Sequence, residues 1–431
     1  MAYNPEIFKD YDIRGVYDKD LDNNFAFKLG SALVKYLGRK TLLIGHDNRD
    51  FSLNLAQTVI TGLHTAGNKC EYLGNSTTPF FNYVLNAKKM GGGVMITASH
   101  NAPEYAGFKL FGARGKAIFK GSGLEDLQQY IEADSAAVGF PKVINFISKR
   151  LELQRDYIKF LIKKAHVKQN DLEKVRVKIS GPDTTLAEVE QLKTWINLRT
   201  AEAGYDLSFI FDEDADRVYI FDKDNNPVRA DFIVGLLAKD AVRFLKRPRV
   251  VHDLRFSRGV TGKLNEWGIK TIISRVGRTF IKELMVKNRA DLGGELSGHI
   301  YFKETYYNEA PLLTLLEITG LMAKSGMAIT ELIRSFQTWH NSGEINFRTS
   351  PHPKLKPRGD EENEIREKLN KLKSKYSDGE TNELDGLTIY YPDWWFNIRP
   401  SHTEPLLRLT VEAKEKNLLE QKVNEISPLL R

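Results

Sequence analysis

The feature that most constrains the fold of this chain is a glycine-rich apolar segment that leads into a small polar turn. Residues 91–96 read Gly-Gly-Gly-Val-Met-Ile, and residues 97–101 read Thr-Ala-Ser-His-Asn. A short apolar run bounded by turn residues is typical of a buried strand. The turn would hold the hydroxyl of Ser99 at the carboxyl end of that strand, which is where open α/β sheets bind their ligands.

Strand and helix patterns alternate along the chain, which predicts α/β units. The expected strands are 41–45, the apolar run within 91–96, 175–179, 207–211, 218–221, 250–253, 300–302 and 406–411. The expected helices are one with apolar residues at 25, 29, 33 and 37, then 53–66, one that begins at 77–79, 151–167, 278–288 and 417–429. The charged stretch 354–375 is expected to be a solvated linker followed by a surface helix.

Length and composition narrow the class of protein. A chain of 431 residues is long for one core and predicts two to four domains. A single cysteine excludes a disulfide framework and a thiolate zinc site. No apolar run of about 18 residues and no signal peptide is seen, so we expect a cytoplasmic protein with no membrane partner. The net charge of +7 is well mixed and lacks a basic block interleaved with aromatics, which argues against nucleic acid and suits small anionic substrates.

Ser99 can be interpreted as a nucleophile or as an ordinary turn residue. A nucleophilic serine needs a base or a partner primed to receive its phosphate. The hydrolase motif Gly-x-Ser-x-Gly is absent because Ala98 and His100 flank the serine. His100 is a poor candidate for the base, because the side chains of sequence neighbours usually diverge. The turn alone leaves both interpretations open.

The acidic loop 212–217 reads Asp-Glu-Asp-Ala-Asp-Arg and lies between two apolar strands. Carboxylates at Asp212, Asp214 and Asp216 can converge on one hard cation. An EF-hand would need glycine and glutamate where Arg217 and Lys223 stand, so that type of calcium site is excluded. A metal site is preferred to a solvated acidic turn, and three carboxylates with open positions suit Mg²⁺.

Two further loops carry groups suited to a phosphosugar. In 293–299, Glu295 and Ser297 offer the acceptor and donor that sugar hydroxyls require, although glycines alone also explain a turn there. In 399–405, and at Arg408 beyond it, guanidinium and hydroxyl groups combine with turn amides that can bind phosphate. A P-loop and a His-Glu-x-x-His motif are both absent.

Taken together, these motifs resemble those of the α-D-phosphohexomutase family, in its phosphomannomutase/phosphoglucomutase branch. Four loops match in the family's order along the whole chain: the phosphoserine loop 97–101, the metal loop 212–217, the sugar loop 294–299 and the phosphate loop 399–405. Segments 11–15, 342–346 and 394–396 add to the resemblance.

The resemblance implies an α/β fold of four domains around a central cleft. Three related α/β/α units with mixed sheets would be followed by a small α+β C-terminal domain. The expected boundaries are 1–145 with the phosphoserine loop, 146–246 as a shortened domain II with the metal loop, 247–346 with the sugar loop, and 347–431 with the phosphate loop.

The resemblance also implies an isomerase that interconverts hexose 1-phosphate and hexose 6-phosphate through phosphoserine and a bisphosphate intermediate. The catalytic positions would be Ser99, Lys109, Arg14 and His100, and Mg²⁺ would bind Asp212, Asp214, Asp216 and a phosphate oxygen on Ser99. The substrate-binding positions would be Tyr11, Arg217, Arg278, Glu295, Ser297, His299, Arg399, Ser401, His402, Thr403 and Arg408. A hexose 1,6-bisphosphate would act as activator, and the chain would be a monomer or a weak homo-oligomer.

Several positions depart from the family pattern. Ala102 and Ala106 replace the usual proline and asparagine, and Glu213 replaces a glycine in the metal loop. Arg278 stands where histidine is common, the loop around Asn308 lacks the usual aspartate, and domain II is short. Two alternatives therefore stay open: a phosphoglucosamine mutase, and a catalytically weakened relative that binds phosphosugars.

Overall fold

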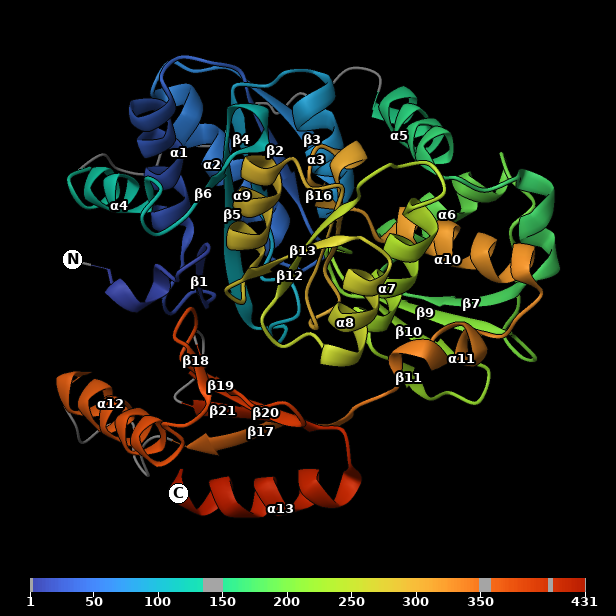
Figure 1. Ribbon diagram of the computed structural model, residues 1–431. Coiled ribbons are helices and arrows are strands. Elements are labelled where there is room, and N and C mark those ends of the chain that lie inside the picture. The colour runs from blue at the N-terminus through green and yellow to red at the C-terminus, as the bar shows by residue number, and fades with distance from the viewer. Residues whose placement is uncertain (1–2, 135–149, 349–357, 402–405, 431) are drawn as a thin grey trace. The chain divides into compact units, whose positions relative to one another are not determined.

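The computed structural model describes residues 3–134, 150–348, 358–401 and 406–430 (Figure 1). The chain divides into two compact units. The first unit comprises Met1–Ala230 and Ser297–Ile329, and the second comprises Asp231–Leu296 and Thr330–Arg431. Each unit is described by itself.

The first unit begins with a mixed sheet of six strands in the order β1-β5-β4-β2-β3, with β6 paired to β5. These strands are β1 (Ile13–Val16), β2 (Leu42–His46), β3 (Cys70–Asn75), β4 (Gly92–Ile96), β5 (Tyr105–Gly112) and β6 (Ala117–Ile118). Strands β2, β3 and β4 are parallel, whereas β1, β5 and β6 pair antiparallel. The associated helices are α1 (Asn23–Leu37), α2 (Ser52–Thr65), α3 (Thr78–Ala87) and α4 (Leu124–Glu132).

Helices α1 and α2 pack closely because glycines face each other at their contact (Figure 1). A Cβ atom on Gly30 would lie 2.3 Å from the carbonyl oxygen of Val59, and one on Gly62 would lie 2.0 Å from that of Phe27. Larger residues at either position would force the two helices apart. Apolar side chains from both helices, such as Leu29, pack with side chains from β2 and β4 in a core of this unit.

A second sheet of the first unit has the order β11-β10-β9-β7-β8. Its strands are β7 (Arg176–Ser180), β8 (Arg199–Thr200), β9 (Leu207–Phe211), β10 (Val218–Asp222) and β11 (Pro227–Val228). The same unit contains three further helices, α5 (Arg150–Lys164), α6 (Asp183–Lys193) and α10 (Pro311–Ser325). It also contains a hairpin of β15 (Ile300–Phe302) and β16 (Asn308–Glu309). Strands β9 and β10 pair antiparallel, with Phe211 opposite Val218. The acidic loop 212–217 therefore connects the adjacent ends of these two strands.

The second unit contains parallel strands and an antiparallel sheet. The parallel strands are β12 (Arg249–Asp253), β13 (Lys270–Ser274) and β14 (Leu292–Gly294), accompanied by α7 (Ala230–Ala241), α8 (Arg258–Glu266) and α9 (Arg278–Asn288). The antiparallel sheet has the order β17-β21-β20-β19-β18. Its strands are β17 (His340–Arg348), β18 (Glu380–Asn382), β19 (Leu387–Tyr390), β20 (Trp394–Pro400) and β21 (Leu406–Ala413). Two helices accompany this sheet, α12 (Arg358–Lys375) and α13 (Lys416–Ile426). A separate apolar core, which includes Phe396 and Leu409, lies beneath this sheet.

The expected strands and helices are confirmed, with ends that differ by a few residues. The helix expected at 151–167 is α5, the one at 278–288 is α9, and the charged stretch contains α12. The C-terminal helix ends at Ile426 and is followed by a 3-10 helix, Ser427–Leu429. Other short helices are the 3-10 helices Pro5–Ile7, Ala113–Gly115, Gln169–Lys174, Lys303–Thr305 and Arg334–Phe336, and α11 (Ile329–Leu332).

The α/β class with mixed sheets is confirmed, while the four domain boundaries stay a prediction. Over the described ranges, no single helix has the length and apolar composition needed to cross a membrane. One pair of helices, Pro311–Ser325 and Ile329–Phe336, passes that test jointly, but the pair is bent by 88°.

Candidate active site

Ser99 lies in the turn after β4, as the sequence predicts. Its backbone has a φ of 51°, in the left-handed region that residues with a side chain rarely adopt. The amide of Ser99 donates to Oγ1 of Thr97 at 2.9 Å, and a Cβ at Gly107 would lie 2.5 Å from the carbonyl oxygen of Thr97. The strained turn is therefore fixed by close backbone packing. Such strain is concentrated at functional sites.

Two arginines hold the serine loop from outside. Arg49 donates to the carbonyl oxygens of Ser99 and Asn101, both at 2.7 Å, and Arg14 donates to the carbonyl oxygen of Ala98 at 3.1 Å. Arg14 is in turn paired with Asp12 at 2.8 Å. Arg14 was predicted from the resemblance, whereas Arg49 was missed. The available signal for Arg49 was its place in the polar turn that follows β2, a neighbour of β4 in the sheet.

The acidic loop meets the serine. Oγ of Ser99 donates to Oδ2 of Asp212 at 3.0 Å. One carboxylate oxygen from each of Asp212, Asp214 and Asp216 lies within 4.8 Å of the others, and the last two side chains are fully buried. Burial, followed by the neighbouring Asp216 and Asp214, raises the pKa of Asp212 well above its usual range. The loop thus gathers three carboxyl groups at the serine hydroxyl.

These carboxylates fit a divalent cation. Oδ1 of Asp214 is buried and carries no hydrogen bond among the residues that the structure describes. An unsatisfied buried carboxylate oxygen is costly unless a cation compensates it. Hard cations such as Mg²⁺ prefer oxygen ligands of this kind.

Lys109, on β5, supplies a buried positive charge to the same loop. Its Nζ lies 2.5 Å from Oδ2 of Asp214 and also pairs with Asp216, and the side chain is 1% exposed. Thr78, the first residue of α3, binds Asp214 as well, through its hydroxyl and through its amide at 2.8 Å from the Asp214 carbonyl oxygen. Asp214 is therefore held from two elements, β5 and α3.

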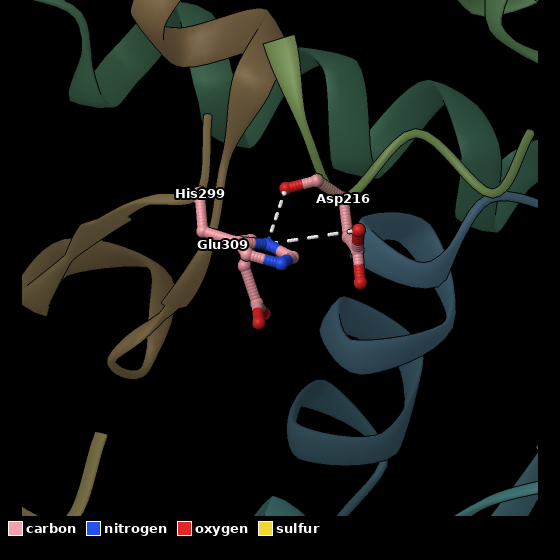
Figure 2. Close-up of side chains that lie close together, drawn as sticks. All are labelled: Asp216, His299 and Glu309. Atoms are coloured by element: carbon pink, nitrogen blue, oxygen red, sulfur yellow. Dashed lines mark hydrogen bonds and ion pairs between the residues drawn. The ribbon is translucent and has the colours of Figure 1, made fainter. Parts of the chain in front are cut away.

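His299 and Arg217 extend this cluster. Nε of Arg217 donates to Nε2 of His299 at 3.1 Å, while Nδ1 of His299 lies 3.2 Å from the carbonyl oxygen of Asp216. Figure 2 shows the His299 ring facing Asp216 and the Glu309 side chain, from β16, beside that ring. One carboxylate oxygen of Glu309 lies within 4.8 Å of ligand atoms of the other two residues. Glu309 was missed, because it stands outside the sugar-loop motif.

His100, Tyr11 and Ser297 also belong to the first unit. Nδ1 of His100 lies 3.4 Å from Oγ of Ser99, and burial, together with Arg217 and Arg14, lowers its pKa to about 4. The imidazole is therefore neutral near neutral pH. Tyr11 is partly buried just before β1, and Ser297 is partly buried in the loop before β15.

In the second unit, Glu344 gathers three guanidinium groups. Its carboxylate oxygens lie 2.9 Å from Nη2 of Arg399, 2.7 Å from Nη1 of Arg408 and 3.2 Å from Nη1 of Arg255. Burial alone would raise the pKa of Glu344, but Arg399, Arg255 and Arg408 together hold it below its usual value. The three guanidinium groups gathered at this carboxylate offer the forked donors that suit a phosphate. Arg399 and Arg408 were predicted, whereas Arg255 was not, although it follows the carboxyl end of β12.

Glu295 and Arg278 lie near each other in the second unit. Oε1 of Glu295 accepts from the amide of Gly277 at 3.2 Å, just before Arg278 begins α9. Asp253 pairs with Arg255 at 2.8 Å and accepts from the amide of Leu296 at 2.9 Å. Hydrogen bonds thus connect the sugar loop to Asp253 at the end of β12 and to Gly277 just before α9.

The phosphate loop is described only in part. Arg399 is the second-last residue of β20, and the amide of Ser401 donates to the carbonyl oxygen of Leu406 at 2.8 Å. His402 and Thr403 lie outside the described residues, so their predicted roles stay predictions.

Known proteins resemble this chain over most of its length. Three family models match the chain: phosphoglucomutase/phosphomannomutase alpha/beta/alpha domain I over residues 5–137, alpha/beta/alpha domain III over 229–339, and the C-terminal domain over 344–428. A phosphomannomutase of Methanocaldococcus jannaschii is 34% identical over 98% of this chain and 97% of that protein. Phosphohexose mutases of Xanthomonas campestris pv. campestris are 29% identical over 98% of this chain and 99% of theirs.

Among solved structures, a phosphoglucomutase/phosphomannomutase family protein from Burkholderia thailandensis has a TM-score of 0.83 at 21% identity, covering 99% of this chain and 97% of that one. At that identity the likeness establishes the fold. The family models and the archaeal relative establish the family. The chain belongs to the phosphoglucomutase/phosphomannomutase family, the α-D-phosphohexomutases, and is a phosphohexose mutase.

Proposed function

We propose that this mutase interconverts the 1-phosphate and 6-phosphate of mannose, glucose or both, with Ser99 as the residue that carries the phosphoryl group. The observation that carries the proposal is the 3.0 Å hydrogen bond from Oγ of Ser99 to Asp212, within a cluster of buried carboxylates. A phosphoserine there would stand beside a cation site, which is what phosphoryl transfer requires.

For the metal we propose Mg²⁺, held by Asp212, Asp214, Asp216 and a phosphate oxygen on Ser99. When bound, the ion would neutralise the charge of the transferring phosphoryl group. The buried Oδ1 of Asp214, which lacks a hydrogen bond among the described residues, supports this assignment.

The chain's own residues position the reacting atoms. Arg49 and Arg14 hold the backbone of the serine loop, and Arg217 and Lys109 place positive charge beside it. Preorganised cations of this kind stabilise charge in the transition state. In the transfer step, the P–O bond to Ser99 breaks as a P–O bond to a sugar hydroxyl forms. Lys109 would donate its proton to the departing serine oxygen and recover the proton that the sugar hydroxyl releases.

In the second unit, we propose that Arg399 and Arg408 bind the phosphate that is not transferred, with Arg255 beside them. Glu295 would accept a hydrogen bond from the sugar, and Arg278 would contribute a cation at the start of α9. Ser297, His299 and Tyr11 would contact substrate from the first unit, and Ser401, His402 and Thr403 from the phosphate loop. A hexose 1,6-bisphosphate would serve as activator because it can recharge Ser99.

The test is a coupled assay of purified protein with Mg²⁺ and a hexose 1,6-bisphosphate, on mannose, glucose and glucosamine 1-phosphates. Turnover of mannose or glucose 1-phosphate that disappears with Ser99→Ala supports the proposal. Turnover of glucosamine 1-phosphate alone would overturn the substrate assignment. Turnover that persists in Ser99→Ala would overturn the assignment of the phosphoryl carrier.

A further inference from the structure

Glu188 is a buried carboxyl group outside the groups described above. It lies on α6 in the first unit and is 3% exposed. Its Oε1 accepts a hydrogen bond from Oγ1 of Thr77 at 2.8 Å. Burying a carboxyl group costs free energy, so a buried glutamate is expected to serve a specific structural or functional role.

Thr77 connects Glu188 to the start of α3. Its Oγ1 also accepts from the amide of Phe80 at 3.2 Å, so the hydroxyl caps the helix while it donates to Glu188. The next residue, Thr78, binds Asp214 through both its amide and its hydroxyl. A chain of direct contacts therefore runs from Glu188 through Thr77 and Thr78 to Asp214.

The charged and titratable groups that act on Glu188 are Arg150 and Tyr157, both on α5. Arg150 donates to the carbonyl oxygens of Leu73 and Asn75, at 2.7 and 2.6 Å, which fixes its guanidinium at the end of β3. Burial raises the pKa of Glu188 to about 8, although the Thr77 hydrogen bond and Arg150 oppose the shift. The carboxyl group is thus mostly protonated at neutral pH, yet it still accepts from Thr77.

We propose that Glu188 is a positioning residue for the metal loop: through Thr77 it fixes the first turn of α3, and that turn fixes Asp214. The inference rests on the proposed metal-binding role of Asp214. Glu188 touches neither the serine nor the carboxylate cluster in any contact that the structure describes, so its effect must pass through the helix start.

The test measures Mn²⁺ binding to the unphosphorylated protein by electron paramagnetic resonance. Because a lost buried hydrogen bond corresponds to roughly a tenfold effect, Glu188→Ala and Thr77→Val should each weaken Mn²⁺ binding about tenfold. Glu188→Gln and Thr77→Ser, which keep an acceptor and a hydroxyl, should bind Mn²⁺ nearly as the parent protein does. Glu190→Gln is the matched control, because Glu190 lies on the same helix with a side chain that is 68% exposed.

Two further readouts separate positioning from a merely structural role. The double variant Glu188→Ala/Thr77→Val should bind Mn²⁺ no more weakly than Thr77→Val alone, because Thr77→Val already removes the contact with Glu188 in addition to the helix cap. Mn²⁺ affinity should tighten between pH 7 and pH 9 more in the parent protein than in Glu188→Gln, because only in the parent does the acceptor for Thr77 become a carboxylate, which accepts a hydrogen bond more strongly. Should Glu188→Ala fail to fold, the comparison of Thr77→Val with Thr77→Ser tests the same contact.

The inference is overturned if folded Glu188→Ala and Thr77→Val bind Mn²⁺ like the parent, or if their effects simply add. Failure of the proposed function has a different signature. In that case Asp214→Asn would leave Mn²⁺ binding unchanged.

Discussion

Oγ of Ser99 donates a hydrogen bond to Oδ2 of Asp212 at 3.0 Å, although the two residues are 113 positions apart. This bond connects the turn after β4 to the loop between β9 and β10. It brings the hydroxyl that would carry phosphate to the carboxylates that would hold the cation.

Ser99→Ala should reduce kcat by at least about a thousandfold, because no other hydroxyl replaces the phosphoryl carrier. The small side chain is lost from a buried turn, so the thermal unfolding midpoint should change little. Steady-state kinetics and a melting curve on the same preparation check both statements. Ser122→Ala, in a turn after β6, is the control and should keep parent kinetics.

Lys109→Met should destabilise the metal-free protein by about 3–5 kcal/mol, since Asp214 and Asp216 would lose a buried cation. Added Mg²⁺ should recover part of that loss, because a ligand that binds only the folded state stabilises it. Urea unfolding in EDTA and in Mg²⁺ measures both effects. Lys120→Met, whose side chain is 65% exposed, should change stability by less than about 0.5 kcal/mol.

Much of this architecture could be predicted from the sequence because local signals agree with the fold. Strands β4, β9 and β10 are short apolar runs, and the metal loop lies between two of them, so the turn and the carboxylates could be placed in advance. What could not be predicted are contacts between distant elements. Arg49 holds the serine loop across 50 residues and Thr78 holds Asp214 across 136, and no local pattern at either position indicates its partner.

The stability of the protein should depend on pH through Glu188. Its pKa is about 8 in the folded protein and 4.5 in an ordinary setting, so the folded state keeps a proton that the unfolded state releases. The contribution of this group to stability is therefore complete below pH 4.5, declines as pH rises toward 8 and levels off above that. Between these two pKa values, the free energy of unfolding should fall by about 1.4 kcal/mol per pH unit because of this group. In Glu188→Gln this contribution to the pH dependence should be absent. Urea midpoints from pH 6 to pH 9 measure the difference, and equal slopes in both proteins would contradict it.

Glu344→Gln should raise the KM for hexose phosphate by about tenfold, because Arg399, Arg408 and Arg255 lose the carboxylate that orients them. The kcat should change less, because Glu344 is not among the residues proposed to take part in phosphoryl transfer. Initial rates over a range of substrate concentrations separate the two constants. Glu383→Gln, which removes an exposed pair with Lys373, should leave KM as it is, and an equal rise in both variants would argue against an orienting role for Glu344.

Arg255 and Glu344 in the second unit show why some site residues could not be assigned from the sequence. Arg255 follows β12 without a motif of its own, and its role becomes visible only when Glu344, 89 residues later, is seen to bind it. Glu309 is similar, because its place opposite Tyr301 in a hairpin brings it to His299. Pairing between strands creates such neighbours, and the sequence around each residue does not show them.

The most direct test of the central claim is to follow phosphate on Ser99 itself. The protein is incubated with hexose 1,6-bisphosphate, freed of excess reagent and examined by intact-mass and peptide mass spectrometry, before and after addition of unlabelled hexose phosphate. The account predicts one phosphoryl group on the peptide that contains Ser99, and its loss to the sugar when the hexose phosphate is added. A protein that turns over substrate while Ser99 stays unmodified throughout would contradict it.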